Sequence, residues 1–155
     1  MDLQGTYSFD APASAVWDRL INPEVVARCL PGCDGLEPAG EDTYRVKLTM
    51  TVAAISGSYE GTIALVDKQP PRSYKLLIDG HGRSGFVKGE ATLELAEENG
   101  KTLVTVRGTA DVGGLIARVG QRLLGSVSKM MMDRFFACLQ SKNSEFGDGR
   151  VQKFP

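Results

Sequence analysis

The sequence predicts an α+β fold in which a curved antiparallel sheet wraps around a long C-terminal helix. Apolar residues alternate with polar ones through most of residues 34–112, which indicates strands with one wet face. The spacing then changes to about 3.6 residues over 113–142, which indicates an amphipathic helix. A chain of 155 residues is usual for one domain. We expect that domain to span 1–142, followed by a short polar tail over 143–155.

The N-terminal segment predicts one strand followed by two short helices. Residues 2–9 alternate, and residues 10–22 carry apolar side chains at helical spacing. Pro23 suits the first turn of a second helix over 23–30. The pair Pro31–Gly32 then predicts a sharp exit from that helix, because proline stops a helix and glycine permits the turn.

The middle of the chain supplies the remaining strands, for a total of about seven. Turn residues such as Ser56–Gly57 and Pro70–Pro71 separate the alternating segments. The clearest segments are residues 43–52, 58–66, 73–80, 86–95 and 102–112.

The C-terminal helix is long enough to cross the concave face of such a sheet. About 28 residues give ~42 Å at 1.5 Å per residue, whereas a strand of ~10 residues spans ~33 Å. This order of elements is the helix-grip arrangement. Several inward positions are small, and they fit either close packing of the helix or a ligand cavity. These positions are Gly61, Gly89, Ala91, Gly108, Ala110 and Gly120.

Composition excludes some classes of function. Lys and Arg total 18 and Asp and Glu total 19, so a generally basic nucleic-acid binder and a disordered chain are disfavoured. No apolar run approaches the ~20 residues of a membrane span, and the N-terminus is polar. We therefore expect a cytoplasmic protein whose thiols are reduced.

Two short motifs suggest chemistry that their surroundings do not support. Cys29 and Cys33 have a spacing that zinc sites tolerate, but the other ligands would be Cys138, on the apolar stripe, and His81, in a glycine-rich turn. We favour a turn over a metal or redox site. Residues 80–85 match G-x-G-x-x-G, but a strand follows instead of the helix that a dinucleotide site requires, so this segment predicts a hairpin loop.

Residues 30–37, 42–67 and 70–95, together with the C-terminal helix, resemble the CoxG family of carbon monoxide dehydrogenase subunits, within the START-like, or SRPBCC, superfamily. The resemblance extends from about Leu3 to Leu139. It is strongest in the sequences LPGC, which begins at residue 30, and GFVKG, which begins at residue 85.

The resemblance implies a non-enzymatic partner of a molybdenum hydroxylase of the carbon monoxide dehydrogenase type. It implies a hydrophobic ligand such as a respiratory quinone, no covalently bound cofactor, and a role in bringing the enzyme to the inner face of the cytoplasmic membrane. It also implies that Cys33 belongs to a turn and has no metal role. Longer members carry a C-terminal extension that contributes to membrane attachment, whereas this sequence closes with a short polar segment.

The inward faces carry few groups for acid–base catalysis, which needs ionisable side chains beside the substrate. Tyr44, Tyr59 and Tyr74 lie near strand ends. Arg134 falls at the centre of the helical stripe, where it either reaches to solvent or donates to a ligand carbonyl or acidic group. A carrier is therefore favoured over a START-like cyclase or hydrolase of an aromatic or polyketide-like substrate. An adaptor with a filled core is a third interpretation.

Three sets of site residues follow from these patterns. The predicted ligand site consists of Leu48, Met50, Tyr59, Ile63, Leu76, Ile78, Val106, Leu123, Val127, Met130, Met131 and Arg134. The predicted gate consists of Gly113, Gly114, Leu115 and Ile116, with residues 33–36 or 80–85 as the opposite lip. The predicted docking face for the enzyme or the membrane consists of Arg118, Arg122, Lys129, Met132, Phe136 and Leu139.

Overall fold

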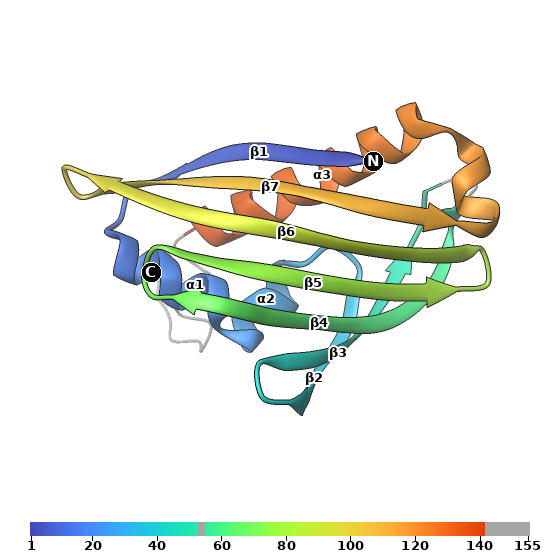
Figure 1. The fold of residues 1–155 in the computed structure, drawn as a ribbon, viewed down its shortest axis with the longest axis horizontal. Helices are drawn as coiled ribbons and strands as arrows, with labels where there is room; N and C mark the ends of the chain where they lie inside the picture. Colours follow the sequence, from blue (N-terminus) through green and yellow to red (C-terminus); the bar gives the residue numbers. More distant parts are fainter. Residues whose placement is uncertain (53–54, 142–155) are drawn as a thin grey trace.

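Seven strands form one antiparallel sheet, and the helices lie on a single face of it (Figure 1). The computed structural model describes residues 1–52 and 55–141. The predicted tail at 143–155 lies outside these residues. In chain order the elements are β1 (Asp2–Phe9), α1 (Ala13–Ile21), α2 (Pro23–Cys29), β2 (Cys33–Gly40), β3 (Thr43–Met50), β4 (Gly57–Gln69), β5 (Ser73–Gly82), β6 (Gly85–Glu98), β7 (Lys101–Gly113), η2 (Gly114–Val119) and α3 (Gln121–Gln140).

The strand order confirms the predicted helix-grip sheet. It runs β1-β7-β6-β5-β4-β3-β2, so the first two strands of the chain lie at opposite edges. The chain must therefore cross the sheet between them, and α1 and α2 make that crossing (Figure 1). Period-two alternation survives in the register, which places Ile63 opposite Ile78 and Tyr74 opposite Leu93.

Inward glycines allow neighbouring strands to approach closely. A Cβ atom at Gly61 would lie 1.9 Å from the carbonyl oxygen of Asp79. A Cβ atom at Gly108 would lie 2.4 Å from the carbonyl oxygen of Glu90. Glycine is required at both positions because either side chain would collide with backbone, as expected where a sheet bends strongly.

The C-terminal helical region differs from the prediction of one uninterrupted helix. It consists of a short 3₁₀ helix, η2, followed by the 20-residue α3. Gly120 separates them with φ 94°, a backbone conformation that glycine adopts without steric cost. The helical phase therefore starts anew at Gln121, so side chains before and after Gly120 do not share one straight stripe.

Apolar packing divides into two clusters at opposite ends of the concave face. The larger contains Trp17, Tyr74 and Phe136 beneath α1 and α3. The smaller surrounds Ile116 and Val127, where η2 meets α3. Among the described residues, no helix has the length and apolar content of a membrane span.

Candidate ligand-binding site

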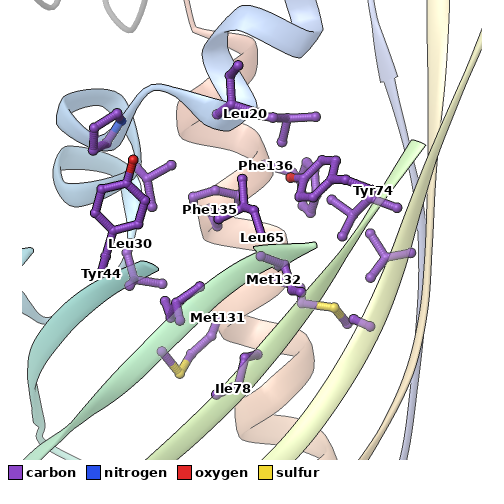
Figure 2. Close-up of a pocket in the computed structure, with 18 of the residues that line it drawn as sticks. Leu20, Leu30, Tyr44, Leu65, Tyr74, Ile78, Met131, Met132, Phe135 and Phe136 are labelled. Atoms are coloured by element: carbon purple, nitrogen blue, oxygen red, sulfur yellow. The ribbon is translucent and has the colours of Figure 1, made fainter. Parts of the chain in front are cut away.

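An apolar cavity of about 220 Å³ lies between the concave face of the sheet and the helices (Figure 2). Nearly all of its lining side chains are hydrocarbon or thioether, and the two tyrosines contribute the hydroxyl groups. The lining residues are Leu3, Leu20, Ile21, Pro23, Val26, Leu30, Leu36, Tyr44, Ile63, Leu65, Tyr74, Leu76, Ile78, Ala91, Leu93, Val106, Met131, Met132, Phe135 and Phe136.

The cavity has a deep end and a more open side. Leu20, Tyr74 and Phe136 are each only 3 % exposed. Leu30 and Tyr44 are half-buried. Figure 2 shows these two groups on opposite sides of the cavity.

Tyr74 is held at the deep end by aromatic packing. Its ring meets the indole of Trp17 edge to face, with centroids 5.4 Å apart. Burial raises the pKa of the Tyr74 hydroxyl far above its usual value, so the group remains neutral.

A disulfide between Cys29 of α2 and Cys138 of α3 ties together the two helices at the edge of the cavity. The expectation that all three thiols are reduced, with Cys138 packed as a free apolar residue, is therefore wrong. The third cysteine, Cys33, is free and follows the turn at Pro31–Gly32, as predicted. Disulfides are more typical of oxidising compartments. The cytoplasmic location stays a prediction, and the Cys29–Cys138 disulfide argues against it.

The cavity brings together part of the predicted ligand site. Ile63, Leu76, Ile78, Val106 and Met131 line it, because the alternation along β4, β5 and β7 correctly identifies the inward face. Their contact with a ligand stays a prediction.

The other predicted ligand residues lie elsewhere. Most pack in the smaller cluster around Ile116, and the Tyr59 hydroxyl there donates to the carbonyl oxygen of Ile55 at 2.7 Å. Their placement in the cavity is wrong because alternation and helical spacing identify the inward face but not how far along that face the cavity extends. The residues that do not line the cavity are Leu48, Met50, Tyr59, Leu123, Val127, Met130 and Arg134.

Arg134 does not line the cavity, which fits the interpretation that it reaches to solvent and not that it donates to a ligand, and the outward placement of the apolar docking residues is wrong. Arg134 is exposed, whereas Phe136 is 3 % and Leu139 0 % exposed. Met132 lines the cavity. The Phe136 ring stacks on Tyr7 of β1 with centroids 4.1 Å apart. In the C-terminal half of α3 the inward face therefore includes Met132, Phe136 and Leu139, at spacing i, i+4 and i+7, and not Arg134.

The basic residues of the predicted docking face do point to solvent. Arg118, Arg122 and Lys129 are exposed. Lys129 forms an ion pair with Asp133 at 3.1 Å. The hydrogen bond from Tyr7, and then that from Lys129, lowers the pKa of Asp133. Whether this surface docks a partner stays a prediction.

The predicted gate does not border the cavity. Ile116 is buried in the smaller cluster and its N–H donates to the carbonyl oxygen of Ser84 at 2.7 Å, while Leu115 is 58 % exposed. Gly113 and Gly114 lie against the β5–β6 hairpin, one of the two expected lips. The smaller cluster packs at this end of the sheet, and ligand passage here stays a prediction.

The helical wall formed by α1 and α2 has no counterpart in the predicted site. Leu20, Pro23 and Leu30 line the cavity, and no local pattern shows which face of the sheet these short helices cross. Tyr74 is also absent from the predicted site. It shares strand parity with Leu76 and Ile78, so alternation alone could have included it.

Comparisons with known proteins agree with this architecture. Residues 5–144 match the model of the CoxG family, which is described as a subunit of carbon monoxide dehydrogenase. A crystal structure of a conserved protein from Geobacillus kaustophilus is 35 % identical, with a TM-score of 0.90 over 94 % of this chain and 97 % of that one. No match was found among curated proteins.

More distant structures share the fold alone. A START superfamily protein from Mycobacterium smegmatis is 12 % identical, with a TM-score of 0.70 over 90 % of this chain and 94 % of that one. Protein Ms6760 from the same organism is 18 % identical, with a TM-score of 0.63 over 90 % and 88 %.

Proposed function

The chain belongs to the CoxG family of carbon monoxide dehydrogenase subunits, and we propose that it is a non-enzymatic accessory protein that holds a hydrophobic molecule in this cavity. In this proposal the protein presents a quinone- or lipid-like molecule to a molybdenum hydroxylase of the carbon monoxide dehydrogenase type. It thereby helps to couple that enzyme to the membrane.

The apolar cavity is the observation that carries the proposal. An engineered apolar cavity of about 150 Å³ binds benzene, so about 220 Å³ suffices for a ring of similar kind. Drug-sized ligands occupy roughly 300–1,000 Å³. A larger molecule would therefore insert one end and leave the rest near Leu30 and Tyr44, or displace the flexible side chains of Met131 and Met132.

The same lining favours a carrier over a START-like cyclase or hydrolase. General acid–base catalysis needs an ionisable group within reach of the substrate. The residues that line the cavity include no carboxylate, histidine, lysine or arginine. The tyrosine hydroxyls alone do not supply the paired acid and base that such an enzyme would use.

A surface around Phe86 and Leu115 suits contact with the membrane or the enzyme better than the docking face predicted from sequence, whose apolar residues Phe136 and Leu139 are buried. Phe86 is 48 % and Leu115 58 % exposed, and Arg83, Arg118 and Arg122, which are near them in the sequence, are also exposed. Residues 80–87 and 112–124 contain no acidic residue. Each basic residue near an anionic membrane contributes about 1 kcal/mol, so this surface supports weak, reversible contact.

Two alanines of β6 provide a matched test of the cavity. Ala91 lines it, whereas Ala96 is exposed. Ala91→Phe should fill the cavity and weaken binding of 2-methylnaphthalene at least about tenfold, followed through the fluorescence of Trp17, the single tryptophan. Ala96→Phe should bind like the wild type. Equal binding by both variants, each shown by thermal unfolding to be folded, would contradict the proposal.

A further inference from the structure

The hydroxyl of Tyr74 is a buried polar group without a partner among the described residues. Tyr74 is 3 % exposed, yet its oxygen makes no hydrogen bond within residues 1–52 and 55–141. Other hydroxyls are satisfied: Tyr7 donates to Asp133 at 2.9 Å, and the buried Thr102 donates to the carbonyl oxygen of Ala11 at 2.8 Å. Buried polar groups nearly always have partners, so this exception needs an explanation.

The position of the hydroxyl supplies that explanation. Tyr74 lines the deep end of the cavity, and Figure 2 shows its oxygen directed inward, toward Phe136. The side chains of Leu20, Leu93 and Phe136 around it offer no acceptor. The packing of Trp17 against the ring holds this orientation. The partner of the hydroxyl must therefore come from what occupies the cavity.

The chemistry of the lining limits that partner to a neutral acceptor. A carboxylate would enter without a compensating cation, because no basic residue lines the cavity, and an unpaired buried charge is very unfavourable. An alcohol would bring its own O–H donor, and the deep end offers no further acceptor for it. A carbonyl oxygen requires only a donor. The neutral Tyr74 hydroxyl supplies one.

We propose that the ligand is a neutral molecule with a carbonyl oxygen at its leading end, and that the Tyr74 hydroxyl donates a hydrogen bond to that oxygen. Ketones and quinones are the matching chemical classes. The ligand then enters carbonyl first, and its apolar remainder extends toward Tyr44 and Leu30. This inference rests on the proposed function of the cavity and adds an orientation and a specificity-determining residue.

Two probes of matched shape test the inference. 2-Methyl-1,4-naphthoquinone carries carbonyl groups, and 2-methylnaphthalene has the same carbon skeleton without them. Tyr74→Phe removes the hydroxyl and retains the ring. It should weaken binding of the quinone roughly three- to tenfold, the value of one neutral hydrogen bond, and leave binding of the hydrocarbon unchanged. Tyr59→Phe, which removes a hydroxyl outside the cavity, should change neither affinity.

Infrared spectroscopy gives a second reading that a merely structural tyrosine would not affect. The carbonyl stretch of the bound quinone should lie at lower frequency in the wild type than in Tyr74→Phe. Equal losses for both probes, or no loss and no spectral difference, would overturn the inference while leaving the cavity proposal intact. If the wild type bound neither probe, the proposed function would fail together with the inference.

Discussion

Reduction of the Cys29–Cys138 disulfide should destabilise the fold and loosen the connection between α2 and α3. The bonded cysteines are 109 residues apart. The chain-entropy relation gives about 4.8 kcal/mol for a loop of that length, and measured disulfides typically contribute about 2–4 kcal/mol. One kcal/mol shifts the melting temperature of a chain this long by roughly 2–4 °C. We therefore expect reduction to lower the melting temperature by roughly 10 °C.

Thiol titration and thermal unfolding together provide the assay. Of three cysteines, only Cys33 is free, so denatured but unreduced protein should show one reactive thiol and reduced protein three. Cys138→Ser should reproduce the thermal effect of reductant, and Cys33→Ser is the control that should not. Three reactive thiols before reduction, or an unchanged melting temperature after it, would refute the reasoning.

Three further predictions test the packing, the pH response and the exposed surface. Leu139→Ala should cost about 2–5 kcal/mol of unfolding free energy because the side chain is fully buried, whereas Leu103→Ala, at a 43 % exposed site, should cost far less; equal losses in denaturant titrations would contradict the packing. Burial, and to a smaller extent the neighbouring Asp133, raises the pKa of Tyr7 from 10.0 to about 12. The neutral Tyr7 hydroxyl therefore stabilises the fold fully below pH 10, and this contribution is lost between pH 10 and 12. Tyr7→Phe should lose less thermal stability than the wild type over that interval, and the same alkaline profile in both proteins would contradict this role of Tyr7. Phe86→Ser combined with Leu115→Ser should reduce flotation with anionic vesicles and capture by a carbon monoxide dehydrogenase-type enzyme, while Leu103→Ser should not; undiminished binding in both assays would remove this surface from the account.

The sheet was predictable because period two continues along every antiparallel strand. Ile63, Leu76 and Ile78 are correctly placed inward from alternation alone. Tyr74 has the same parity, but its depth depends on Trp17 in α1, which is close only in the folded protein.

The helical side of the cavity was less predictable because it depends on tertiary geometry. Within α3 the inward face includes Met132, Phe136 and Leu139, so Phe136 lies in the core and Arg134 points to solvent. The Cys29–Cys138 bond joins residues so far apart in sequence that their spacing carries no signal. The family resemblance predicted the fold but not which residues of these helices face the cavity.

Native mass spectrometry of the chain purified without detergent tests the central claim most directly. We predict a species heavier than the bare chain, whose added mass is lost on denaturation and is recovered in an organic extract as a neutral, carbonyl-bearing molecule. Protein purified without ligand should acquire the mass of 2-methyl-1,4-naphthoquinone on incubation, and Ala91→Phe should not. A bare chain in every preparation, with no uptake of that quinone or of 2-methylnaphthalene, would contradict the claim that the cavity carries a ligand.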